Sequence, residues 1–333
     1  MNTLSVCLIV KDEALTLKRA LENAASIADE IVVVDTGSSD NSKQIAQKYA
    51  NVYDFLWQDD FSAARNEGIK KCKCDLIMWL DADDVIPEET VQKILALKQS
   101  CSYDMVMLPY EVGNLRFFRE RIFRNDGTHF FAGEVHEAIQ PKGKIGYLDA
   151  PIVHDKKKPH DKYRNLRILQ KVAAKRKLND RELFYYVSEL YFTGDESAKS
   201  ELWRFMKFYG NEAQKGQAAV YLSYAAKSEK EIRSALIEGI EYVNSSDIFT
   251  LLGESYMRER LYYKAKNAFL CATVADEQIV FPVPDRRFYI PYIRLCKCYW
   301  MLGNKVAAKK YNDCVLNIRP TDPYALDNAK LFI

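Results

Sequence analysis

Short apolar runs rich in β-branched residues alternate with segments of helical spacing along the first 110 residues. The apolar runs are of strand length, and the segments between them space their apolar residues three or four apart. This alternation predicts βαβ units, and therefore an α/β domain with a parallel sheet and helices on both of its faces. The expected strands are 4–10, 30–35, 52–57 and 75–81, and the expected helices are 13–25, 40–49, 61–72 and 87–99.

Between residues 103 and 155 the helical segments disappear and strand-like stretches follow one another. Turn sequences, Asn-Asp-Gly at 125–127 and Pro-Lys-Gly at 141–143, separate them. We expect a mixed sheet that completes a first domain of residues 1–155. The expected strands are 105–109, 116–123, 130–139 and 145–152.

Residues 156–333 have helical spacing and an internal repeat. One copy has the spacing of a tetratricopeptide helix pair, a second copy has Asn312 where an aromatic residue is expected, and 183–208 and 218–242 are weaker copies. We expect a short all-α solenoid, because such helix pairs bury their apolar faces against neighbouring pairs. The matching positions are Gly253, Tyr256, Ala265, Phe269 and Ala272 in the first copy, and Tyr299, Gly303, Ala308 and Pro320 in the second.

Composition agrees with two folded domains. The chain has 333 residues, of which 48% are apolar and 28% charged, so a long disordered region is not expected. The net charge of +2 does not indicate a nucleic-acid partner.

The sequence also predicts a cytoplasmic location. The apolar run before Lys11 is too short for a signal peptide, and no stretch approaches the roughly 18 apolar residues that cross a bilayer. The eight cysteines include no C-x-x-C pair, which favours a reducing compartment over a disulfide framework or a zinc site.

Two carboxylates follow the fourth expected strand, in Asp81-Ala82-Asp83. Alternation along a strand places Asp81 and Asp83 on one side, at the carboxyl edge of the sheet. Like charges at this spacing favour a hard divalent cation that keeps positions free for a diphosphate. The alternative is a solvated acidic turn that caps the next helix.

Polar residues follow the other strands as well. Asp35 ends the second expected strand, where it could accept a hydrogen bond from a base or ribose, or merely orient the turn. The segment 10–13 follows the first strand, and 60–66 opens the third helix. Carboxyl ends of parallel strands meet at one edge, so these clusters and Asp81 to Asp83 are expected on a single rim.

With these segments in this order, residues 1–155 resemble a family 2 glycosyltransferase with the GT-A fold. The resemblance implies a UDP-sugar as donor and Mg²⁺ or Mn²⁺ as cofactor. Glu13 and Asp35 would bind the nucleoside, Arg65 the nucleotide end of the donor, and Asp81 the ribose or diphosphate. Asp83 would be a metal ligand. The donor site so implied consists of Val10, Glu13, Asp35, Arg65, Asp81 and Ala82.

The segment Phe-Ala-Gly-Glu-Val-His-Glu at 131–137 resembles the acceptor-side motif of a branch with C-terminal tetratricopeptide-like helices. That branch includes sublancin-type S-glycosyltransferases of bacteriocin peptides and enzymes that build cell-envelope glycans. The position normally supplies the catalytic base from an acidic pair, and here it reads His136-Glu137. We assign Glu137 as the base with His136 beside it. The alternative is that Glu134 and Glu137 form surface ion pairs.

His154 ends an expected strand and matches the position of a third metal ligand in many GT-A enzymes; an imidazole suits Mn²⁺. Arg121 and Arg124 precede the acceptor segment, and we assign them to the diphosphate leaving group, which arginine binds bidentately. Residues 155–177 hold ten Lys and Arg against two Asp. This run is either a solvated helix face or a surface for an acidic peptide or anionic membrane.

These observations predict an inverting, metal-dependent glycosyltransferase with a peptide side chain (Cys, Ser or Thr) or a glycan as acceptor. The helical part would hold the acceptor, and the sequence leaves open whether it also forms a homodimer. One alternative is a helical scaffold with a relic transferase domain. Another is a nucleotidyltransferase, although Lys11-Asp12-Glu13 is unlike the Gly-rich, basic phosphate loop of that class.

Overall fold

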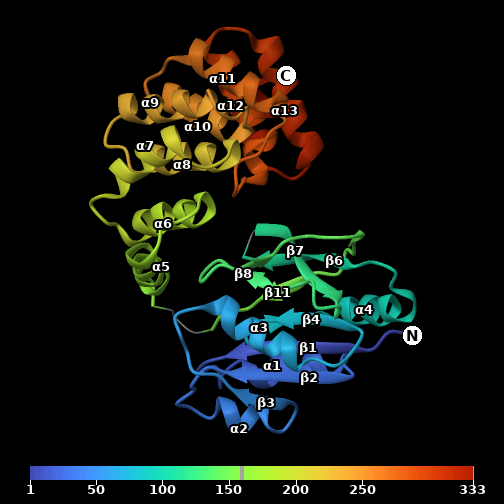
Figure 1. Ribbon diagram of the computed structural model, residues 1–333. Helices are drawn as coiled ribbons and strands as arrows, with labels where there is room; N and C mark the ends of the chain where they lie inside the picture. The colour runs from blue at the N-terminus through green and yellow to red at the C-terminus, as the bar shows by residue number, and fades with distance from the viewer. Residues whose placement is uncertain (114, 158–160, 333) are drawn as a thin grey trace. The chain divides into compact units, whose positions relative to one another are not determined.

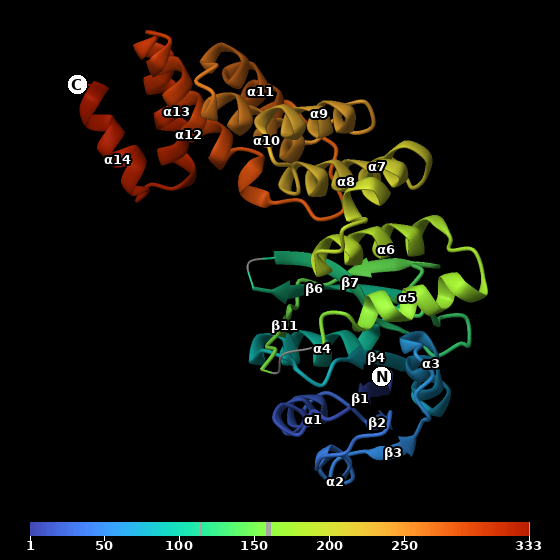
Figure 2. The same ribbon diagram turned by 90° about the vertical axis from the view of Figure 1, so that its left-hand side faces the viewer.

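The computed structural model describes residues 1–113, 115–157 and 161–332, which form two compact units, Met1–Lys171 and Val172–Ile333 (Figures 1 and 2). Along the chain, the boundary between the units falls within helix α5 (Arg164–Lys175), later than the boundary expected at residue 155. The first turns of α5 interact with the first unit. The guanidinium of Arg164 is 4.6 Å from the centre of the Phe61 ring, and Lys171 pairs with Asp59 at 2.5 Å.

The first unit is built on a nine-stranded mixed sheet in the order β3-β2-β1-β4-β7-β6-β11-β5, with β10 also paired to β6. Strands β1 to β4 are parallel, and β7 runs antiparallel to both β4 and β6. The strands are β1 (Leu4–Val10), β2 (Glu30–Asp35), β3 (Asn51–Asp54), β4 (Leu76–Leu80), β5 (Asp84–Val85), β6 (Met105–Val112), β7 (Leu115–Arg124), β10 (Ile145–Tyr147) and β11 (Ile152–His154).

Helices cover both faces of this sheet. On one face, α1, α2 and α4 pack apolar residues such as Leu21 and Ile94 against the central strands. On the other face, α3 packs together with a two-stranded sheet of β8 (Phe131–Ala132) and β9 (Ala138–Ile139). The helices are α1 (Leu17–Ala25), α2 (Ser42–Ala46), α3 (Phe61–Lys71) and α4 (Glu88–Ser100).

Two of the expected strands are interrupted. The stretch 130–139 contains β8 and β9 separated by a loop, because Gly133 (φ 102°) and His136 (φ 52°) adopt left-handed backbone conformations that end a strand. The stretch 145–152 is divided between β10 and β11. The prediction of one continuous strand was therefore wrong for both stretches. The loop at 133–137 carries both expected catalytic residues.

The close approach of α3 to the sheet depends on Gly68. A Cβ atom at this position would lie 2.4 Å from Cys7 Sγ and 3.1 Å from Val34 Cγ2. We expect Gly68→Ala to lower the free energy of unfolding by about 1–3 kcal/mol, because the added methyl group overpacks the interface. Urea denaturation measures the loss. Lys70→Ala, on the exposed side of the same helix, is the control, and equal stability of both variants would contradict the prediction.

The second unit consists of antiparallel helix pairs, as the repeat predicts (Figure 1). In the best copy, Gly253 packs against the Phe269 ring, and Ala265, Phe269 and Ala272 are buried. Asn312 is also buried, where its side-chain amide donates to the Ala325 carbonyl. The helices after α5 are α6 (Asp180–Thr193), α7 (Ala198–Phe208), α8 (Glu212–Tyr224), α9 (Glu229–Ile240), α10 (Ser246–Arg258), α11 (Tyr262–Val274), α12 (Tyr289–Met301), α13 (Lys305–Ile318) and α14 (Pro323–Ala329).

The predicted fold class, an α/β domain of GT-A type followed by a helical domain, is confirmed. Within the part of the chain that the structure describes, none of the helices combines the length and the apolar character needed to cross a membrane.

Candidate functional site

The carboxyl ends of β1, β2 and β4 form one edge, as the parallel pattern predicts. Val10 pairs with Asp35, and Leu8 pairs with Leu80, the last residue before Asp81. The loops after β1 and β2 are hydrogen-bonded to each other, because Asp12 N donates to the Ser38 hydroxyl at 3.0 Å. Glu13 N donates to the hydroxyl of Ser42, the first residue of α2, at 2.7 Å. The polar residues that follow separate strands are thus brought together by backbone register.

A cavity of about 640 Å³ opens at this edge, lined by residues of the first unit alone. It contains most of the side chains that the sequence singles out. Those lining it are Val10, Glu13, Arg65, Asp81, Ala82, Asp83, His136, Glu137 and His154. The single rim predicted from the strand ends is therefore a cavity, and acidic side chains predominate among its charged groups.

Asp35 is buried next to Thr36, which lines the cavity. Its Oδ2 accepts the backbone N–H groups of Gly37 and Ser38 at 3.1 and 3.0 Å, so Asp35 does orient the turn after β2. Its Oδ1 is also buried, and no hydrogen-bond partner for it occurs among the described residues. The alternative in which Asp35 orients the turn therefore holds, whereas nucleoside binding by its second oxygen stays a prediction, because Asp35 itself does not line the cavity.

Asp81 forms a 2.7 Å ion pair with Arg65 Nη2, and Arg65 Nε forms a 2.6 Å ion pair with Glu137. Burial raises the pKa of Asp81, but the charges of Arg65 and Arg121 outweigh it and lower the pKa to about 2. Glu137 thus forms the ion pair that the alternative hypothesis suggested. However, its side chain is 12% exposed and faces the cavity, so this is not a surface pair.

Asp83 and His154 are brought together by the pairing of β5 with β11, in which His154 lies opposite Asp84. His154 Nδ1 is 3.4 Å from Asp83 Oδ1 and 3.7 Å from Asp84 Oδ1. Hydrogen bonds to these two carboxylates raise the pKa of His154 to about 10. One ligand atom from each of the three side chains lies within 4.8 Å of the others, which is compatible with binding one metal ion.

Asp84 is a member of this group that the sequence reasoning did not assign, although it directly follows Asp83. It is fully buried, and its Oδ2 accepts hydrogen bonds from Arg121 Nη1 at 2.9 Å and from the backbone N–H of Asp81 at 3.0 Å. Its Oδ1 accepts from the Tyr110 hydroxyl, which also lies 2.9 Å from His154 Nδ1. Asp84 therefore holds neighbouring site residues in place through hydrogen bonds, and little of its hydrogen-bonding capacity is left for a ligand.

Arg121 and Arg124 do not line the cavity, which corrects their assignment to the leaving group. Arg121 is fully buried, paired with Asp84 and 3.7 Å from the centre of the Trp79 ring. Arg124 pairs in register with Leu76, at the beginning of β4 and thus at the end of the strand opposite Asp81. For Arg124 the reason is strand direction, because β7 is antiparallel to β4 and its last residue lies far from the carboxyl edge. Arg121 is near that edge, but its side chain is buried against Asp84 and Trp79.

Other cavity residues were missed as site residues. Lys156 and Arg164 supply cations, and Trp57 and Phe61 pack edge to face with ring centres 4.7 Å apart. The two cations belong to the basic run 155–177. Its two sequence-based interpretations were a solvated helix face and a surface for an acidic peptide or anionic membrane, and neither places these residues in a cavity. Residues 158–160 of this run lie outside the described residues.

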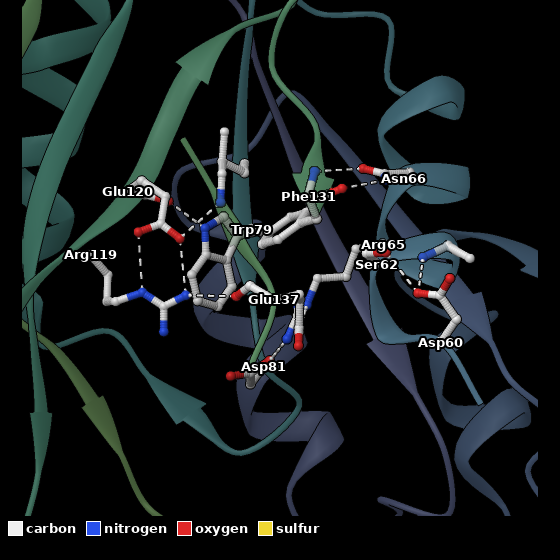
Figure 3. A network of polar contacts seen from close by, with 12 residues as sticks. Asp60, Ser62, Arg65, Asn66, Trp79, Asp81, Arg119, Glu120, Phe131 and Glu137 are labelled. Atoms are coloured by element: carbon white, nitrogen blue, oxygen red, sulfur yellow. Dashed lines mark hydrogen bonds and ion pairs between the residues drawn. The ribbon is translucent and has the colours of Figure 1, made fainter. Parts of the chain in front are cut away.

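The loop that carries His136 and Glu137 is held from the sheet side (Figure 3). Arg119 Nη2 donates to the Glu137 carbonyl at 3.4 Å, and Glu120 accepts from both Arg119 and the Ile139 backbone N–H. The Glu120 carbonyl in turn accepts from the Trp79 indole at 2.5 Å. This network fixes the loop although it has almost no regular secondary structure.

Residues 5–154 match the family described as Glycosyl transferase family 2. This segment comprises 150 of the 333 residues, and the match agrees with the α/β fold and the cavity of the first unit. The first unit is thus similar to glycosyl transferase family 2.

Three relatives illustrate the range of similar proteins. The chain is 30% identical over 191 residues to a TPR repeat-containing protein of Synechococcus elongatus, covering 53% of this chain and 46% of that protein. It is 27% identical over 223 residues to the glycosyltransferase SunS of Bacillus subtilis, covering 59% and 51%. It is 24% identical over 273 residues to the lipopolysaccharide core biosynthesis glycosyltransferase LpsC of Rhizobium meliloti, covering 70% and 97%. The chain thus spans about half the length of the first two.

Proposed function

We propose that this protein transfers a sugar from a UDP-sugar to an acceptor nucleophile, with inversion at the anomeric carbon and with a divalent metal ion. The observation that carries the proposal is the cavity itself. Its lining combines Asp81, Asp83, His154 and Glu137, within the segment that matches glycosyl transferase family 2. The side chains that we assign as base and as metal ligands thus line one cavity.

Asp83 and His154 are the proposed metal ligands, and the structure supports the fit. One ligand atom each of Asp83, Asp84 and His154 lies within 4.8 Å of the others; Asp83 and His154 line the cavity, whereas Asp84 is engaged by Arg121 and Tyr110. When bound, Mg²⁺ or Mn²⁺ would neutralise the charge that develops on the diphosphate. Oxygen and imidazole ligands suit Mn²⁺ in particular.

The protein groups around this centre have separable tasks. Asp35 has one free acceptor oxygen for the nucleoside, beside Thr36. Lys156 and Arg164 line the cavity, and we assign them to the leaving diphosphate in place of Arg121 and Arg124. Glu137 removes the acceptor proton as the bond from the acceptor atom to the anomeric carbon forms and the bond from that carbon to the diphosphate oxygen breaks.

The proposal is tested by measuring UDP release from a panel of UDP-sugars with Mn²⁺ or Mg²⁺, and again after addition of EDTA. Turnover of a donor that requires the metal ion would support the enzyme. Absence of both turnover and metal-dependent UDP binding would contradict it and would favour the helical scaffold with a relic transferase domain.

Two acceptor classes remain in the proposal. Similarity to SunS favours a peptide side chain, whereas similarity to LpsC over 97% of that enzyme's length favours a cell-envelope glycan. Incubation of a radiolabelled donor with peptides containing Cys, Ser or Thr, and with envelope glycan fractions, distinguishes them by the material that acquires the label.

Substitution of the base separates hydroxyl from thiol acceptors. We expect Glu137→Gln to lower kcat about 100-fold or more with a hydroxyl acceptor or water, because general base catalysis is lost. With a cysteine thiol, whose pKa is normally about 8.5, we expect a smaller loss, because the thiolate forms more readily. Steady-state UDP release measures both. Glu134→Gln, in the same loop but outside the cavity lining, is the control, and an equally large loss there would refute the assignment.

A further inference from the structure

Arg65 lies between the donor side and the acceptor side of the cavity, with hydrogen bonds to both. Its Nε donates to Glu137 Oε1 at 2.6 Å, and its Nη2 donates to Asp81 Oδ1 at 2.7 Å (Figure 3). The guanidinium is 4.9 Å from the centre of the Trp79 ring and 5.2 Å from that of Phe131. One cation, which lies beside two aromatic rings that contact each other, joins two carboxylates that the proposed reaction uses for different substrates.

The charge of Arg65 is already offset within the protein. Two carboxylates share one guanidinium, so the three side chains together are net negative when all are ionised. Arg65 is only 8% exposed, and its Nε and one N–H of its Nη2 are engaged by Glu137 and Asp81. This arrangement favours a role of Arg65 in holding other side chains over a role in binding the nucleotide.

The Glu137 carboxylate depends on Arg65 for its position. Arg119 and Glu120 hold the backbone of the loop, through the Glu137 carbonyl and the Ile139 N–H. These bonds leave the torsions of the Glu137 side chain free. Among the described residues, Arg65 is the only group that donates a hydrogen bond to the Glu137 carboxylate.

We infer that Arg65 is a positioning residue: it holds the Glu137 carboxylate at a fixed distance from Asp81, and so aligns proton removal with the bound donor. The inference rests on the proposed function and replaces the role of Arg65 at the nucleotide end of the donor. Misplacement of a general base lowers kcat, whereas loss of a nucleotide contact weakens donor binding as well.

The test is a double-mutant cycle of Arg65→Ala and Glu137→Gln. Steady-state UDP release gives kcat, and titration calorimetry gives the UDP affinity. We expect Arg65→Ala to lower kcat about 100-fold while UDP affinity changes less than about tenfold. Added to Glu137→Gln, the same substitution should lower kcat less than about threefold further, because both act through one carboxylate. Full additivity, or a loss of UDP affinity as large as the loss of kcat/KM, would overturn the inference.

Chemical rescue provides a readout that a merely structural role would not give. Guanidinium ion at millimolar concentration should raise kcat of Arg65→Ala about tenfold and leave Arg116→Ala unaffected. Arg116 is the matched control, because its guanidinium pairs with Glu111 and Asp149 outside the cavity lining. Absence of rescue in a folded Arg65→Ala protein would count against the inference.

If Arg65→Ala does not fold, as judged by circular dichroism, Arg65→Lys takes its place. It keeps the charge but lacks the fork that reaches both carboxylates, so kcat should again fall while UDP affinity is kept. Failure of the proposed function gives a different result. In that case the unaltered chain itself neither binds nor releases UDP, and the inference falls with it.

Discussion

Asp83→Ala should lower metal-dependent UDP release about 1,000-fold while the domain remains folded. Asp83 is one of the two proposed metal ligands, and its side chain is partly exposed to the cavity rather than packed in the core. Without it, His154 alone cannot hold the metal ion that neutralises the leaving diphosphate, and electrostatic stabilisation of this kind accounts for several powers of ten in rate.

The measurement is steady-state UDP release, together with Mn²⁺ binding followed by electron paramagnetic resonance. Both activity and Mn²⁺ affinity should fall together in Asp83→Ala. Asp149→Ala, which removes a carboxylate that is 74% exposed and outside the cavity lining, should change neither. Unchanged Mn²⁺ binding in Asp83→Ala would show that Asp83 is not a ligand.

The sequence predicts the central strands well because hydrophobic alternation reports directly on burial. Strands β1 and β2 begin and end at the expected residues, 4–10 and 30–35. It fails at 130–139, because a left-handed conformation at His136 is not encoded by any hydrophobic pattern. Glycine is the residue that most strongly indicates such a conformation in a sequence, and Gly133 lies three positions earlier.

Site residues that directly follow parallel strands are predictable for the same reason. Asp35 and Asp81 come together because their strands share an edge, which sequence order alone suggests. Arg121 and Arg124 could not be placed in this way. The distance of Arg124 from the cavity depends on the antiparallel direction of β7 and its pairing with β4, and the exclusion of Arg121 depends on its burial against Asp84 and Trp79; the linear sequence contains neither.

The sequence also does not predict which partner each buried polar group has. Asp84 looks like a third member of an acidic cluster, equivalent to its neighbours. Whether a carboxylate faces a ligand or a buried arginine is decided by packing across the sheet, here by Arg121 and Tyr110. Adjacent aspartates can therefore have opposite roles.

Asp84→Ala tests this division of roles through stability. Asp84 and Arg121 form an ion pair in which both side chains are 0% exposed, and the guanidinium is stacked on Trp79 and Tyr110. Removal of the carboxylate leaves a buried cation without its counter-charge. We expect the free energy of unfolding to fall by about 3–5 kcal/mol, which is the usual cost of breaking such a pair. Asp83→Ala, in contrast, should cost less than about 1 kcal/mol.

Urea denaturation of the full chain, followed by tryptophan fluorescence, measures both losses, because Trp79 stacks directly on Arg121. Asp149→Ala breaks an exposed pair with Arg116 and should cost about 0–1 kcal/mol. The double variant Asp84→Ala, Arg121→Met should regain part of the lost stability, since no unpaired charge remains buried. A loss for Asp84→Ala no larger than that for Asp149→Ala would mean that the pair does not hold the site together. Asp84 would then have to be reconsidered as a ligand in its own right.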